Sequence, residues 1–180
     1  MQLMNREIPD SDILRSTLQA HTDYGFAMIK PDGLELGIEH DATIRIEKAG
    51  LQIFDQRLHD LEARHVDAIY AEHTDKPFYR DLRESLIGKT ALSLIVLGDS
   101  VADTLMNIKG SALDISGSIR ADYSLAHSLP EPLHSAYQNG TLTSTQLFQA
   151  GFGDVMAFNR IHCDEDLIGA ERSIQAVFSK

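Results

Sequence analysis

The sequence predicts an α+β fold, an α/β sandwich in which an antiparallel β-sheet is covered by helices. Strand and helix patterns alternate in the order β-α-β-α-α-β-α-insertion-β-α, which is typical of a split-βαβ sheet. The chain has 180 residues, of which 43% are hydrophobic. This is enough for one soluble domain with its own core.

The first half of the chain alternates between the two patterns. Residues 11–21 open with capping residues and carry apolar residues at helical spacing, which predicts a helical extension over residues 1–22. The apolar run 24–30 ends at Pro-Asp-Gly, as a buried strand that leaves into a turn does. The other segments of this half are a helix at 41–50, a strand at 51–58, and helices at 61–73 and 76–88.

The second half begins with the most strand-like run of the chain, residues 90–99, which we expect at the centre of the sheet. A short helix at 100–110 follows. Residues 124–153 contain Pro, Ser, Gly, Gln and Thr and have weaker periodicity, so we interpret them as an insertion. A strand at 155–162 and a helix at 164–178 close the chain, with acidic residues where the helix dipole favours them.

Composition excludes several classes of protein. The net charge of −11 argues against broad contact with nucleic acid or anionic membranes, because both need a basic face. Cys163 is the only cysteine, so no intrachain disulfide can form and a reducing compartment is expected. The sequence shows no apolar run of about 20 residues and no signal pattern at its start. These features predict a cytoplasmic protein.

The stretch Asn-Arg-Ile-His-Cys-Asp-Glu-Asp, residues 159–166, places His162 beside a cysteine and three acids. Three interpretations compete. The histidine can be a bystander at a helix start, a metal ligand, or a group that does chemistry. A metal hydrolase site is the weakest of these, because the candidate ligands are sequence neighbours with no second histidine at metal spacing.

Four motifs together resemble the nucleoside diphosphate kinase family. They are Ile-Lys-Pro-Asp-Gly at 29–33, Ile-Tyr-Ala-Glu-His-Thr-Asp-Lys-Pro-Phe-Tyr at 69–79, Ser-Ile-Arg-Ala-Asp-Tyr at 118–123, and Asn-Arg-Ile-His at 159–162. The resemblance covers about residues 24–178 apart from the stretch before Asn159, which suggests a kinase-like domain over 23–180 with an insertion at about 124–153. It implies a ferredoxin-like fold, homo-oligomers, Mg²⁺-nucleotide substrates and a phosphohistidine intermediate.

The resemblance also implies which residues handle the phosphates. His162 matches the family's phosphate-accepting nucleophile, and Lys30 matches a lysine that contacts phosphate and ribose. Arg120 matches an arginine that holds the phosphates, and Asn159 a ribose-contacting asparagine. These residue types suit phosphoryl transfer, which needs a nucleophile in line and positive charge around the moving group. A neutral imidazole is a competent nucleophile near pH 7, since its ordinary pKa is about 6.5.

The base would lie on the other side of the same site. Tyr70 matches a tyrosine that lines the family's site, and Phe78 and Leu82 match the wall against which the base packs. The spacing from Tyr70 to Leu82 fits the family without a gap. A wall that holds a base by its face distinguishes bases weakly, so broad nucleotide tolerance is expected.

The residues after His162 depart from the family pattern. Cys163, Asp164 and Glu165 stand where the family usually has a small residue, then Ser, then Asp. Acids so close to the imidazole are expected to raise the pKa of His162. We predict that Asp164 caps the last helix; the other reading is that it orients the imidazole. Glu165 is a candidate for holding Mg²⁺-bound water.

Other departures fall further from the histidine. The family's glutamate that hydrogen-bonds the imidazole falls on Ser173, and a second phosphate-binding arginine falls on Asn107, with Lys109 as a candidate substitute. The loop before residue 118 is shorter than usual and loses a threonine. These losses leave an alternative to the active kinase, namely a weakly active or inactive member of the family that binds nucleotides or serves assembly.

Overall fold

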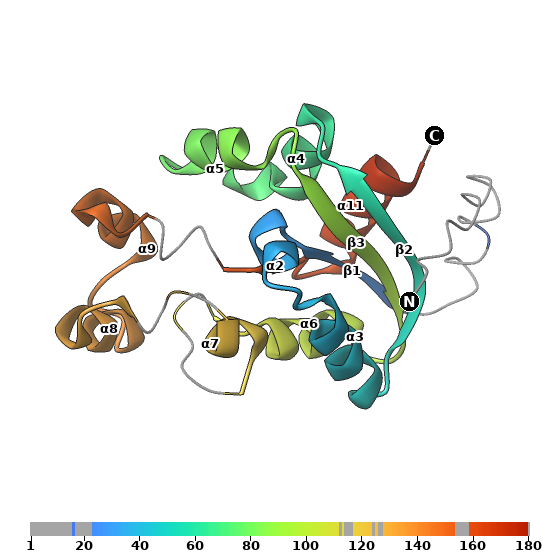
Figure 1. Cartoon of the computed structure of the whole chain (residues 1–180), viewed down its shortest axis with the longest axis horizontal. Helices are drawn as coiled ribbons and strands as arrows, with labels where there is room; N and C mark the ends of the chain where they lie inside the picture. The colour runs from blue at the N-terminus through green and yellow to red at the C-terminus, as the bar shows by residue number, and fades with distance from the viewer. Residues whose placement is uncertain are drawn as a thin grey trace.

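The computed structural model of the protein describes residues 16, 23–111, 113, 117–123, 125, 128–153 and 159–179. Figure 1 shows a sheet between two layers of helices, with further helices grouped at one end of the molecule. The helical extension predicted at 1–22 lies outside the described residues except for Ser16.

The sheet has four strands in the order β2-β3-β1-β4, and every neighbouring pair is antiparallel. The predicted α+β class is therefore confirmed, and the run 90–99 lies inside the sheet as expected. The strand expected at 155–162 is shorter where the structure describes it, and residues 154–158 lie outside the described part. The strands are β1 (Tyr24–Ile29), β2 (Gln52–Asp60), β3 (Thr90–Leu97) and β4 (Ile161–Cys163).

The helices follow the predicted order with two local differences. The Pro-Asp-Gly expected to be a turn begins a short helix, in which proline costs no hydrogen bond because the first N–H groups have no partner. The helix expected at 61–73 divides at Tyr70. The helices are α2 (Pro31–Glu35), α3 (Glu39–Lys48), α4 (Ala63–Ile69), η1 (Ala71–His73), α5 (Tyr79–Leu86), α6 (Val101–Lys109), α7 (Ile119–Tyr123), α8 (Glu131–Gln138), α9 (Ser144–Leu147), η3 (Phe148–Phe152) and α11 (Leu167–Phe178).

Strand β1 is buried on both faces because helices cover both sides of the sheet. Its residues alternate between the two cores: Phe26 and Met28 pack with α4, α5 and α11, whereas Ala27 and Ile29 pack with α3 and α6. Figure 1 shows the two helical layers on opposite sides. On β4 the same alternation directs Ile161 and Cys163 into the α3–α6 core and leaves His162 on the opposite face.

Part of the predicted insertion has a small core of its own. Leu113, Leu129 and Leu147 are buried together, and partly buried side chains from α8, from the turn before α9 and from η3 pack around them. We call the described segment from residue 128 to residue 153 the insertion lobe. Figure 1 shows its helices α8 and α9 at the end of the molecule, beyond the sheet.

A buried ion pair connects the end of β1 to the start of β4. Oδ2 of Asp32 accepts hydrogen bonds from the backbone N–H of Arg160 at 3.2 Å and from its guanidinium at 3.1 Å. Arg160 has a positive φ of 67°, which a non-glycine residue adopts only when its surroundings enforce it. Its carbonyl accepts from the N–H of Lys30 at 2.9 Å. These contacts bring Lys30 beside the residues that flank β4.

Removing the Asp32 carboxylate should therefore destabilise the fold. We expect Asp32→Ala to lower the free energy of unfolding by on the order of 3 kcal/mol, because the buried guanidinium loses its partner. Urea denaturation followed by circular dichroism measures this. The exposed pair Arg80–Glu84, with an N–O distance of 3.0 Å, provides the control: Arg80→Ala should leave the unfolding midpoint unchanged. Equal effects of the two substitutions would contradict the proposed importance of the buried pair.

Candidate active site

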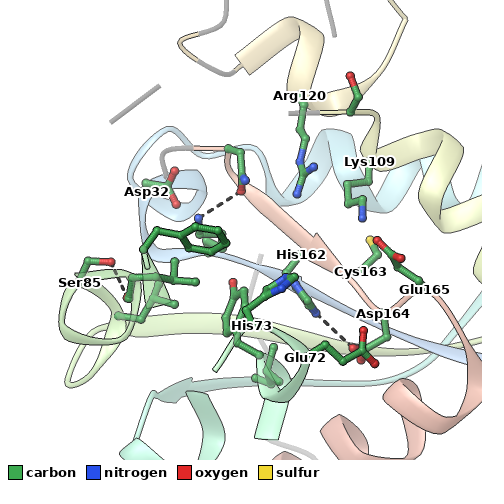
Figure 2. Close-up of a pocket in the computed structure, with 18 of the residues that line it drawn as sticks. Asp32, Glu72, His73, Ser85, Lys109, Arg120, His162, Cys163, Asp164 and Glu165 are labelled. Carbon is green, nitrogen blue, oxygen red and sulfur yellow. Dashed lines mark hydrogen bonds and ion pairs between the residues drawn. The ribbon is translucent and has the colours of Figure 1, made fainter. Parts of the chain in front are cut away.

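A cavity of about 700 Å³ opens between the sheet, α5 and the insertion lobe. It is lined by residues from the end of β1, from α4 to α5, from the end of α6, from α7 and from β4. Figure 2 shows Lys109 and Arg120 directed toward the space beside His162, with Asp164 on the other side of the imidazole. The cavity gathers all the residues proposed for the site as nucleophile, nucleotide contacts or auxiliary groups: Lys30, Tyr70, Phe78, Leu82, Lys109, Arg120, Asn159, His162, Asp164 and Glu165.

The His162 side chain is held on two sides and is only 14% exposed. Its Nε2 lies 3.3 Å from Oδ1 of Asp164, and the ring centroids of His162 and Tyr70 are 4.7 Å apart. Burial lowers the pKa of His162, and this outweighs Asp164, which acts to raise it. Asp164 thus acts in the expected direction, but the net change in the pKa of His162 is opposite to the rise that was expected. The reason is that the imidazole is desolvated and also faces Lys109 and Arg120.

The predicted capping role of Asp164 is also wrong. The N-cap of α11 is Asp166, whose side chain accepts a hydrogen bond from the N–H of Gly169 at 2.7 Å. Asp164 still belongs to the extended chain, since its N–H donates to the carbonyl of Phe26 at 3.2 Å. Residues two apart on an extended chain project to the same face, so the Asp164 carboxylate meets His162. Gly169 leaves room for it: a Cβ there would lie 3.2 Å from Oδ1 of Asp164.

Ser173, which matches the family's histidine-binding glutamate, gives no such support. The residue is fully buried on α11. Within the described part of the chain its hydroxyl has no hydrogen-bond partner. The carboxylate contact to the imidazole therefore comes from Asp164 at the end of β4.

Three cationic side chains line the cavity near His162. Nζ of Lys30 donates to Oδ1 of Asn159 at 3.2 Å, and burial lowers the pKa of Lys30 to about 8. Arg120 donates to the carbonyls of Gly110 and Ile161 at 3.2 and 3.1 Å, and burial lowers its pKa. Burial and the nearby Arg120 lower the pKa of Lys109 as well. Buried cations that repel one another favour binding of an anion between them.

The remaining predicted residues form the rest of the lining. Phe78 and Leu82 are half-buried at the start of α5, and Tyr70 is buried under the imidazole. Glu165 is exposed. Cys163 is buried, and burial raises the pKa of its thiol to about 12, so it carries no thiolate near neutral pH. Among the described residues no group of three or more His, Cys, Asp or Glu side chains could hold a metal ion.

Some lining residues were not anticipated from the sequence. Arg172 donates to the carbonyl of Ala68 at 2.8 Å and so attaches α11 to α4. Tyr137 and Phe148 enter the cavity from the insertion lobe. The weak periodicity of that lobe carried no signal for them. Glu72 and His73 lie inside a motif that was recognised, and they could have been found from it.

Comparison with known proteins assigns the family. The sequence model of the family described as nucleoside diphosphate kinase matches residues 23–180. The chain belongs to the nucleoside diphosphate kinase family. A member from Thermobifida fusca is 34% identical over 101 residues, which cover 54% of this chain and 75% of that protein. A member from Bacillus cereus is 28% identical over 158 residues, 86% of each chain.

Solved structures show the same fold. The nucleoside diphosphate kinase of Halobacterium salinarum, in complex with CDP, superposes with a TM-score of 0.62 at 21% identity and covers 89% of this chain and 90% of that one. The Borrelia burgdorferi enzyme, with bound vanadate and ADP, gives a TM-score of 0.68 at 19% identity over 88% of each chain. The ferredoxin-like expectation is confirmed.

Family membership makes this protein a nucleotide-binding phosphotransferase of the nucleoside diphosphate kinase type. The alternative of an inactive binding or assembly protein is not favoured. No helix among the described residues is long and apolar enough to cross a membrane.

The contact between Asp164 and His162 can be tested with a matched pair of substitutions. Asp164→Asn and Asp166→Asn each remove one negative charge, two residues apart, and Asn caps a helix as well as Asp. We expect Asp164→Asn to slow phosphorylation of His162 at least about tenfold, because the imidazole loses the negative charge beside it and the new amide can donate to Nε2, which favours the other tautomer. Asp166→Asn should leave the rate unchanged. The rate is measured in single turnovers with NTP.

Two outcomes would contradict an orienting role for Asp164. Equal slowing by the two substitutions would show that only the local charge matters. An unchanged or faster rate with Asp164→Asn would show that this carboxylate is a bystander.

Proposed function

We propose that this chain transfers the terminal phosphate of a nucleoside triphosphate to a nucleoside diphosphate, with His162 as the phosphate carrier. One observation supports this most directly. A buried imidazole with a lowered pKa lies between a carboxylate at 3.3 Å and side chains that carry positive charge. That arrangement keeps the imidazole neutral near pH 7 and gives the arriving phosphate its counter-charges.

The contact with Asp164 indicates which imidazole nitrogen reacts. If Nε2 carries the proton and donates it to Oδ1 of Asp164, then Nδ1 holds the free electron pair. In the first half-reaction Nδ1 forms a bond to the terminal phosphorus, and the bond from that phosphorus to the bridging oxygen breaks. The diphosphate leaves with those electrons. The second half-reaction reverses these events with another diphosphate as acceptor.

The cations would stabilise the phosphates during transfer. Lys30 and Arg120 approach from β1 and α7, and Lys109 occupies the end of α6 where the resemblance placed a substitute for the missing arginine. The hydrogen bond from Lys30 to Asn159 sets the ammonium at the entrance to β4, where Asn159 would also meet the ribose. Such preorganised charge is the largest contribution that a protein makes to phosphoryl transfer.

The base would pack against Phe78 and Leu82 at the start of α5. Tyr70 would line the part of the site next to His162. Half-buried apolar side chains offer a surface but no directional hydrogen bonds. A site of this kind tolerates different bases.

Mg²⁺ is proposed to enter with the nucleotide, bound to its phosphate oxygens. Carboxylates suit this ion, and the exposed carboxylate of Glu165 lines the cavity, so it would hold water bound to the ion. When present, the ion neutralises phosphate charge. Homo-oligomers are also proposed, and the 73% exposed Ile168 and 41% exposed Leu167 on α11 are consistent with a covered surface. Cytoplasmic location stays a prediction from the sequence.

Labelling with γ-phosphate-labelled ATP tests the nucleophile. The protein should acquire acid-labile, alkali-stable label, which is the signature of phosphohistidine. His162→Ala should abolish this label and retain the circular dichroism spectrum, because the side chain lines a cavity and no helix depends on it. His73→Ala is the matched control in the same cavity and should keep the label. Undiminished labelling of His162→Ala would refute the proposal.

The pH dependence of kcat/KM tests the role of Lys30. Its pKa of about 8 predicts that kcat/KM falls above about pH 8, because the free enzyme then loses a positive charge from the phosphate site. Lys30→Arg should remove this fall between about pH 8 and 9.5, since guanidinium stays protonated there. Lys109→Arg should retain it. A profile that is flat in the unsubstituted enzyme would contradict the assignment of Lys30.

A further inference from the structure

The insertion lobe reaches the cavity with an aromatic side chain. Phe148, the first residue of η3, lines the cavity. Its ring centroid lies 6.4 Å from that of Phe78, and the two ring planes are tilted by 56°. Phe78 belongs to the wall proposed above for the base, so Phe148 adjoins that wall.

Phe148 is held in place by its neighbours in the chain. Leu147 is fully buried in the core of the insertion lobe, and Phe152 packs against the same core. The ring of Phe148 lies over Gly153: a Cβ at that position would be 3.0 and 3.1 Å from its Cδ2 and Cε2 atoms. Leu147 and Phe152 therefore pack inside the lobe, while Phe148 lines the cavity. The absence of a side chain at Gly153 leaves space for its ring.

A planar base could fit between the two rings after their separation increases slightly. Two carbon surfaces in contact lie about 3.5 to 4 Å apart, so a base with a ring on each face needs about 7 to 8 Å between them. The observed 6.4 Å falls short of this by about 1 Å. Rotation of the tilted rings toward parallel and a slight outward movement of the insertion lobe would supply it.

We propose that the insertion lobe supplies the second wall of the base site, so that the base is held between Phe78 and Phe148. This inference rests on the proposed function, because it takes the ligand to be a nucleotide. Stacking on an aromatic ring contributes to base binding whatever the base, and it grows with the area of the ring. The clamp therefore strengthens binding of all bases and favours purines over pyrimidines.

The experiment compares a nucleotide with a ligand that has the phosphates but no base. Dissociation constants of ADP, CDP and inorganic tripolyphosphate are measured by calorimetry for the unsubstituted protein, Phe148→Ala and Phe148→Leu. With Phe148→Ala we expect the dissociation constant of ADP to rise about 5- to 30-fold, that of CDP to rise less, and that of tripolyphosphate to stay unchanged. Phe148→Leu, which keeps an apolar side chain in the lobe, should show the same ranking: the largest loss of affinity for ADP, a smaller loss for CDP and none for tripolyphosphate. Gln149→Ala, an exposed neighbour on the same turn, should change none of them.

The outcomes separate the clamp from the proposed function. Unchanged ADP affinity in both Phe148 variants would overturn the clamp and leave the phosphotransferase intact. An equal loss for ADP and tripolyphosphate would also overturn it, because the damage would then lie outside the base site. Failure of the unsubstituted protein to bind any of the three ligands would overturn both proposals. Loss of His162 labelling with retained ADP binding would overturn the proposed nucleophile alone.

Discussion

The short pairing between β1 and β4 is the constraint on which the site depends. Only Ala27, Met28 and Ile29 pair with β4 among the described residues, and Met28 lies opposite His162. So few ladder bonds would hold a strand weakly. The ion pair of Asp32 with Arg160 and the bond from Lys30 to the carbonyl of Arg160 reinforce it at one end. The peptide groups that fix the strand thus also set the distance between Lys30 and His162.

Burying three cationic side chains beside the cavity lowers the stability of the fold, and the proposed function accounts for it. Lys30, Lys109 and Arg120 are buried or nearly so, and each loses part of its tendency to be charged. Nε of Arg120 is buried without a partner in the described part of the structure. If these side chains bind the phosphates as proposed, their mutual repulsion is relieved when the anion enters, and the free energy lost in folding is recovered as binding affinity.

Sequence patterns predicted the secondary structure well because the buried face of a helix or strand requires apolar residues at the spacing of that element. The alternation of β1 between two cores and the apolar run of β3 are local properties, and the residues that line the cavity could be proposed because four motifs kept their order. Asp164 was misassigned for a physical reason. An acid directly after a strand can continue the strand or begin a helix, and only the hydrogen bond from its N–H to the carbonyl of Phe26 decides between them. Phe148 could not be predicted either, since it approaches Phe78 only through the packing of the insertion lobe.

In the proposed function, Asp164 takes the role that the resemblance gives to a glutamate at the position of Ser173. A glutamate on α11 would reach the imidazole from a helix packed on the sheet, so its position depends on how the helix and the strand are docked. Asp164 sits on the chain that carries His162, and the two residues share a face because the backbone between them is extended. A shorter side chain on the same strand has fewer rotatable bonds to order, and Gly169 gives it space against α11. With the carboxylate supplied next to the strand, the corresponding position on α11 is occupied by the uncharged, buried Ser173.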